Sequence, residues 1–132
     1  MTVIIRRTRF SFPVIGCPVS MQSSRDSKQQ YKALVTEAAR GNVDKPVEAS
    51  RKVKIEIDWF SQGFVNKPDV DNIVKLIQDA LKDIVFVDDG QVESITARKH
   101  DSTSVMSFTK ESLSIIEPIM NGHQEYIFVR IY

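Results

Sequence analysis

The sequence predicts an α/β (α+β) fold, with one small mixed β-sheet flanked by helices. Segments in which apolar and polar residues alternate are interleaved with segments whose apolar residues recur at helical spacing. The predicted order is strand, helix, strand, helix, strand, an unassigned segment and a final strand. The chain has 132 residues, 42% of them hydrophobic, which suits a single domain spanning residues 1–132 with its own core.

The first elements are a strand and a helix. Residues 2–12 are rich in β-branched and aromatic residues and predict a strand. Residues 13–24 contain two prolines and a glycine, which favour a loop. Ser27 and Gln30 fit a capping box, so a helix is expected from there to Gly41. Its apolar face consists of Tyr31, Leu34, Val35, Ala38 and Ala39.

The second strand and helix have the clearest periodicity. Residues 53–59 alternate strictly, which predicts a strand with one buried face, and Pro68 breaks the run that follows. We expect Asp71 to cap the next helix, because its carboxylate accepts hydrogen bonds from free N–H groups of the first turn. The buried stripe of this helix consists of Ile73, Leu76, Ile77, Ala80 and Ile84.

The last third of the chain is less regular. Residues 91–99 and 126–132 predict strands because both are rich in β-branched or aromatic residues. Residues 101–124 are ambiguous, and one alternative is a short helix over residues 110–116 that Pro118 ends.

The net charge of +1 conceals an asymmetry between the two halves of the chain. Residues 1–54 carry eleven Lys/Arg and four Asp/Glu, or +7, whereas residues 55–132 carry seven and thirteen, or −6. A basic half beside an acidic patch suits a polyanion drawn toward a metal site. The alternative, that the charges mix on the folded surface, stays open.

Several classes of site are absent from the sequence. Cys17 is the only cysteine, so no intrachain disulfide forms and a zinc site lacks thiolate partners, which favours a reducing cytoplasm. We expect no signal peptide and no membrane span, because no apolar run approaches about 18 residues. The sequence contains no glycine-rich phosphate loop, so we expect no nucleotide cofactor. His100 and His123 are isolated and are expected to be surface or core residues, so no nucleophile has a histidine to activate it.

Two acidic pairs carry the functional signal. Asp69 and Asp71 lie two residues apart before the predicted helix, and Asp88 and Asp89 precede a predicted strand. Crowded carboxylates repel one another unless a cation neutralises them, and oxygen ligands suit Mg²⁺, with Mn²⁺ as a substitute. We therefore predict a divalent metal site with Asp69, Asp71, Asp88 and Asp89 as its ligands.

Lys75 lies one turn after Asp71 on the same helix face, where a lysine beside a metal can hold a phosphate. Carboxylates, a metal, an activated water and a cation are what metal-assisted phosphodiester hydrolysis requires. Simpler interpretations exist: Asp71 as a helix cap, Lys75 and Asp79 as a solvated ion pair, and residues 88–90 as a turn. Each explains its own residues, and together they leave the repeated acidic pairing unexplained.

Three blocks of sequence resemble the RusA-type Holliday junction resolvases. They are D-x-D-N-x-x-K at residues 69–75, D-A-L at residues 79–81 and D-D-x-Q-V at residues 88–92. The segment 16–20 is a weaker match, and the likeness covers residues 12–95. The resemblance implies a RusA-like fold and a Mg²⁺-dependent crossover junction endodeoxyribonuclease, often carried by prophages. Such enzymes act as homodimers in DNA recombination and repair and make paired symmetric nicks in branched, four-way DNA.

By the same resemblance, the catalytic residues are Asp69, Asp71, Lys75 and Asp89. The candidates for phosphate contacts are basic residues of the first half, Arg6, Arg7, Arg9, Arg25, Lys28 and Lys32; their alternative is a solvated strand edge and helix face. Two other functions stay open. One is a metal-dependent nuclease acting on other branched or duplex DNA, and the other is a non-catalytic DNA-binding module.

Overall fold

The computed structural model describes residues 8–101, 110–122 and 125–132. Within them, a four-stranded sheet has the order β1-β4-β2-β3. Strands β2 and β3 are parallel and the other pairs are antiparallel, so the expected α+β fold with a mixed sheet is confirmed. The elements are β1 (Phe10–Ile15), α1 (Arg25–Arg40), β2 (Val53–Phe60), α2 (Asp71–Leu81), η1 (Asp89–Gln91), β3 (Val92–His100), α3 (Lys110–Asn121) and β4 (Tyr126–Ile131). None of the described helices is long and apolar enough to cross a lipid bilayer.

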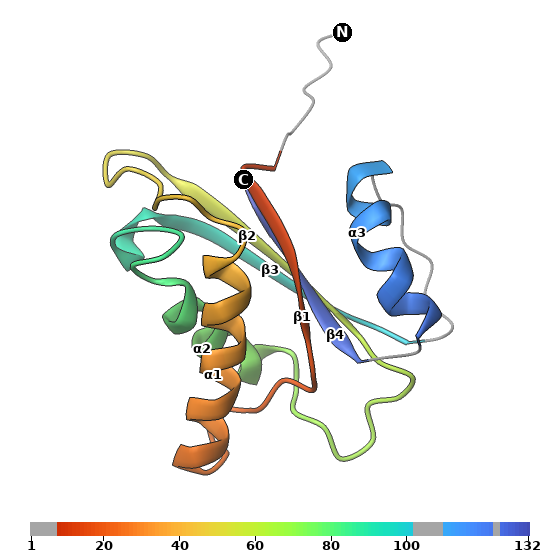
Figure 1. Ribbon diagram of the computed structural model, residues 1–132. Helices are drawn as coiled ribbons and strands as arrows, with labels where there is room; N and C mark the ends of the chain where they lie inside the picture. Colours follow the sequence, from red (N-terminus) through yellow and green to blue (C-terminus); the bar gives the residue numbers. More distant parts are fainter. Residues whose placement is uncertain (1–7, 102–109, 123–124) are drawn as a thin grey trace, which may run out of the picture.

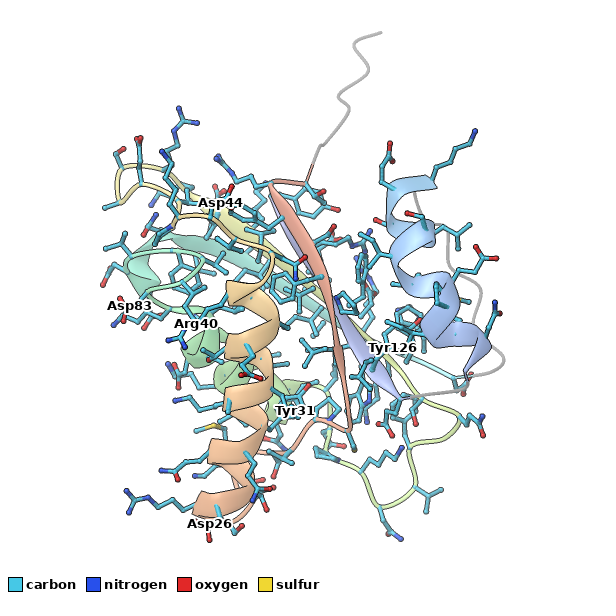
Figure 2. All side chains as sticks on the ribbon, viewed as in Figure 1. Asp26, Tyr31, Arg40, Asp44, Asp83 and Tyr126 are labelled. Atoms are coloured by element: carbon cyan, nitrogen blue, oxygen red, sulfur yellow. The ribbon has the colours of Figure 1, made fainter. Side chains whose placement is uncertain are left out.

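Helices cover both faces of the sheet. Helices α1 and α2 lie on one face and α3 lies on the other (Figure 1). The first face holds the main core, because alternate residues of β2 point toward α1 and α2. Val53, Ile55, Ile57 and Trp59 are at most 1% exposed. The second face has a smaller apolar cluster beneath α3, in which Tyr126 lies between the sheet and the helix (Figure 2).

The first strand lies further along the chain than predicted. It begins at Phe10 and continues to Ile15, so residues 13–15 belong to the strand and not to the expected loop. Pro13 is paired with Phe128 of β4. A proline is tolerated there because β1 is an edge strand, whose outer side needs no N–H donor. The predicted residues 2–7 lie outside the described part of the chain.

Both predicted N-terminal caps are wrong. Helix α1 begins at Arg25, and its N-cap is Ser24, whose hydroxyl accepts a hydrogen bond from the backbone N–H of Ser27 at 3.2 Å. The predicted end at Gly41 is confirmed. Helix α2 has Val70 as its N-cap, without a side-chain bond, and Asp71 is its first residue. The exposed Asp71 carboxylate therefore does not cap the N-terminus of the helix.

The predicted apolar stripes are confirmed except at Leu34 and Ile84. On α1, Leu34 is 46% exposed although it fits the stripe. Helix α2 ends at Leu81, so Ile84 is a half-buried residue of the following turn. Helix α3 runs through Pro118 to Asn121, so the end predicted at this proline is wrong. The two last strands are confirmed within one residue at each end.

Candidate active site

The exposed face of α2 carries the predicted catalytic side chains. Its opposite face is buried in the main core, so the helix has one fixed orientation, and Asp71, Lys75 and Asp79 follow one another at intervals of four residues. Lys75 Nζ lies 2.7 Å from Asp79 Oδ1. The hydrogen bond to Asp79 and the negative charge of Asp79 raise the pKa of Lys75, and the charge of Asp89 adds to this effect. The ammonium is thus kept protonated on the surface.

The turn between α2 and β3 brings Asp89 back to this helix face. Gln78 Nε2 of α2 donates a hydrogen bond to Asp89 Oδ1 at 3.4 Å. Gln78 lies three residues after Lys75 on the same helix, so this contact brings the last predicted catalytic aspartate to the helix that presents the lysine. The predicted metal ligand Asp88 is engaged differently: its Oδ2 accepts a hydrogen bond from Gly90 N at 2.9 Å, and it caps η1.

Gln91 holds this turn in place, a role that the sequence interpretation missed. Its side chain is 4% exposed. Oε1 accepts hydrogen bonds from the backbone N–H groups of Val87 at 2.7 Å and Asp88 at 2.9 Å. Nε2 donates to three carbonyl oxygens of the loop before β2, those of Val47 at 3.2 Å, Glu48 at 2.7 Å and Arg51 at 3.0 Å. In the sequence, the position of Gln91 within the D-D-x-Q-V block was the signal that could have indicated this role.

Asp69 lies on the loop that joins β2 to α2, and Asp71 is the first residue of α2. Asp69 is exposed, and its backbone oxygen accepts a hydrogen bond from Asn72 N at 3.0 Å. Asn72 O accepts one from Met21 N at 3.1 Å, so the loop before α1 packs at the same helix start. The two aspartates therefore lie on the N-terminal turn of the helix that also presents Lys75.

The donor set fits a hard divalent cation. All predicted ligands are carboxylates, and Mg²⁺ is commonly bound by one or two carboxylates together with waters and substrate phosphates. Among the described residues, no group of three or more His, Cys, Asp or Glu side chains lies close enough to form a metal site by itself. The four predicted carboxylates are therefore not gathered into one ligand set among the described residues, and a metal held by one or two of them would take its other oxygen ligands from water and DNA phosphates.

The predicted DNA-contacting cations that the structure describes do not form one patch. Arg6 and Arg7 lie outside the described residues. Arg9 precedes β1, whereas Arg25, Lys28 and Lys32 belong to the N-terminal half of α1, near Asp26 in Figure 2. The six residues of β1 span about 20 Å between these two groups.

Arg9 instead lines a cavity of about 200 Å³ with two cations that sequence reasoning missed, Lys45 and Arg51. All three side chains belong to exposed residues. Arg51 also lies on the loop whose carbonyl groups Gln91 binds. Positive charge is thus placed on a segment that is tied directly to the Asp88–Gln91 turn.

A second polar cluster lies on the other face of the sheet. Asp58 is fully buried, with Oδ1 at 2.8 Å from His100 Nε2 and 3.2 Å from Arg98 Nη1. Its Oδ2 lies 2.8 Å from Arg130 Nη2. His100 is therefore a half-buried partner of this acidic side chain, between the expected surface and core roles, and His123 lies outside the described residues. The strict alternation of β2 places Asp58 on the polar face, which suggested that it faces solvent. This face is instead covered by α3, whose full length was not predicted.

An α+β domain with aspartates and a lysine on one exposed helix face, and a further aspartate brought to it by a neighbouring turn, has the composition of a phosphodiester-cleaving nuclease. A family model described as endodeoxyribonuclease RusA matches residues 20–106. This match covers more than half of the chain, from α1 to β3, including all four predicted catalytic residues. The chain belongs to the RusA family and is an endodeoxyribonuclease. A search of curated proteins gives no match.

Proposed function

We propose that the protein resolves Holliday junctions as a Mg²⁺-dependent homodimer, in DNA recombination and repair in the cytoplasm. One observation carries the proposal: in a chain of the RusA family, a hydrogen bond from Gln78 holds Asp89 against α2, the helix that presents Asp71 and Lys75.

In this proposal Asp69, Asp71 and Asp89 would hold the metal ion together with water and DNA phosphate oxygens, and Asp88 supports Asp89 by capping its turn. When bound, the ion supplies a Lewis acid and an activated water for hydrolysis. Lys75 binds the phosphate group that is cut and stabilises its developing charge. Asp79 keeps the lysine charged and oriented until DNA is bound.

The dimer follows from the product of the reaction. Two symmetric nicks across a four-way junction need two active sites related by a two-fold axis, and a homodimer provides this symmetry. Sequence-independent contacts to phosphates suit a substrate that is recognised by its shape.

The test is cleavage of a labelled synthetic four-way junction with Mg²⁺, beside a linear duplex of equal length. We expect paired nicks on the junction alone, and their loss in Asp71→Asn and Asp89→Asn with junction binding retained. Asp83→Asn is the matched control, because Asp83 is an exposed aspartate at a positive φ of 69°, which asparagine also tolerates. Figure 2 shows Asp83 on the loop after α2.

The same experiment separates the other two functions. Equal cutting of junction and duplex would indicate a nuclease with a broader substrate range. Tight junction binding without metal-dependent cleavage would indicate a binding module, whose affinity should fall steeply with salt. Wild-type cleavage by Asp71→Asn or Asp89→Asn would refute the assignment of the site.

A further inference from the structure

The loop that carries Asp69 and Asp71 is anchored by an ion pair at its base. Lys67 Nζ lies 2.5 Å from Glu125 Oε1, and the two side chains are 24% and 20% exposed. The same ammonium donates a hydrogen bond to Ser61 Oγ at 2.6 Å. Lys67 thus connects Ser61, which directly follows β2, with Glu125, which directly precedes β4.

Aromatic packing attaches the same loop to the main core. Trp59 is fully buried, and its Nε1–H donates a hydrogen bond to Glu125 Oε2 at 2.7 Å. Phe64 of the loop packs edge-on against Trp59, with 4.9 Å between ring centroids. Lys99 Nζ lies 5.2 Å and 4.9 Å from the centroids of these two rings. Both oxygens of Glu125 are therefore engaged, one by the loop and one by the sheet.

The charge state of Glu125 suits a permanent contact. Burial raises the pKa of this carboxyl group, but hydrogen bonds from Lys67, Trp59 and Cys17 together outweigh burial, so the pKa is lowered. The carboxylate is ionised at neutral pH and faces a charged lysine, and a charge-assisted hydrogen bond of this kind is stronger than a neutral one.

Only Pro68 separates Lys67 from Asp69. The proline ring fixes its own φ and restricts the residue before it. A displacement of the Lys67 backbone is therefore passed on to Asp69 and to the first turn of α2, with little freedom to absorb it.

We propose that Lys67 and Glu125 are positioning residues of the nuclease, which hold Asp69 and Asp71 in register with Lys75 and Asp89. Neither touches the reacting phosphate. The part of this inference that concerns cleavage rests on the proposed function, whereas the anchoring of the loop can be tested without DNA or metal.

Cys17 is a native reporter of this contact. Its thiol belongs to an exposed residue. Burial of the sulfur, a hydrogen bond to Glu125 and the charge of Glu125 together raise its pKa to about 11, whereas the charge of Lys67 lowers it. Removing the charge of Glu125 should therefore bring the thiol pKa toward its ordinary value of 9.0.

The first experiment measures loop anchoring in the full chain without DNA or metal. In Glu125→Gln we expect faster alkylation of Cys17 by iodoacetamide at pH 8 to 9 and faster hydrogen exchange over residues 61–72. The matched control is Glu93→Gln, an exposed glutamate of β3, in which neither rate should change. Unchanged exchange of the loop in Glu125→Gln would overturn the proposal whatever the cleavage results are.

The second experiment measures cleavage of the DNA substrate that wild type cuts, at a temperature where all variants are folded. We expect Glu125→Gln and Lys67→Met to lower kcat about ten- to a hundredfold, with the Kd for DNA unchanged in Glu125→Gln. Lys67→Arg should retain most activity, because it keeps the charge. The double variant should lose little more than either single variant, because the two residues act as one unit.

The outcomes distinguish the two proposals. Fast loop exchange together with wild-type kcat in Glu125→Gln would overturn the positioning role. If wild type cuts no DNA, the proposed function fails, and the first experiment alone decides whether the ion pair anchors the loop.

Discussion

Replacing Gln91 by alanine should loosen the turn that carries Asp89. The substitution removes an amide whose oxygen accepts two hydrogen bonds and whose two N–H protons are shared among three carbonyl oxygens. Because the side chain is 4% exposed, its partners lie at an interior site. The turn and the loop before β2 would then face each other across a gap, with unpaired N–H and C=O groups on both sides.

The size of the destabilisation follows from the number of hydrogen bonds lost and from how easily water reaches the groups left unpaired. A neutral hydrogen bond contributes about 1 kcal/mol net, and an orphaned buried group costs about 1–3 kcal/mol. Glu48, Arg51, Val87 and Asp88 are exposed residues, so water can satisfy some of their backbone groups, whereas Val47 is 7% exposed. We expect a loss of about 3 kcal/mol in the free energy of unfolding, out of roughly 5–15 kcal/mol for a typical domain.

Urea denaturation and thermal melting test this value, and Tm should fall by about 10 °C. Gln91→Glu is the matched variant of equal size. Its carboxylate still accepts from two N–H groups but faces three carbonyl oxygens without a proton to donate, so at pH 7 it should be at least as destabilising. Its stability relative to wild type should recover as the pH falls and the carboxyl group is protonated.

Gln30→Ala, at an exposed position of α1, is the control and should stay within about 0.5 kcal/mol of wild type. A Gln91→Ala protein within about 1 kcal/mol of wild type would refute the reasoning. So would a Gln91→Glu protein as stable as wild type at pH 7.

Three further perturbations test the ion pairs. Asp58→Asn removes a buried charge whose partners include Arg130, at 12% exposure, and Arg98, at 43%. Urea denaturation should show a loss of about 2–4 kcal/mol in the free energy of unfolding. This is below the full cost of breaking a buried pair, because Arg98 is partly solvated. Lys75→Met should lower kcat for DNA cleavage by a factor of about 100 to 1,000 with little change in stability, since the side chain is exposed. For Glu125, the folded pKa lies below the ordinary value of 4.5, so the stability advantage of wild type over Glu125→Gln should be complete above that pH and lost as the pH falls through the folded pKa.

Each of these expectations has a contrary result. Unchanged stability of Asp58→Asn would mean that the arginines find solvent or other partners. A fully active Lys75→Met would exclude the lysine from the reaction. A stability difference between wild type and Glu125→Gln that grows as the pH falls below 4.5 would contradict the lowered pKa.

The local sequence pattern was sufficient to predict a strand or helix wherever buried and exposed residues alternate with a regular period along the chain. The alternation over residues 53–59 predicted β2, and the stripe of α2 was predicted to within one turn, because one face of each element is buried along its whole length. The same reasoning failed at Pro13 and Pro118. Whether a proline ends an element depends on where it lies, and an edge strand and an exposed position late in a helix both accept one here.

The sequence by itself determined the family of this protein. The kinds of side chain at residues 69–75 and 88–92, and their spacing, were sufficient to identify an endodeoxyribonuclease family, and the catalytic roles of these carboxylates and this lysine stay predictions. Only the tertiary structure decided how these residues are held. Gln91 binds carbonyl groups about 40 residues earlier, and Glu125 binds Lys67 across 58 residues. Contacts between such distant segments depend on how the sheet and helices pack together, and no local periodicity encodes them.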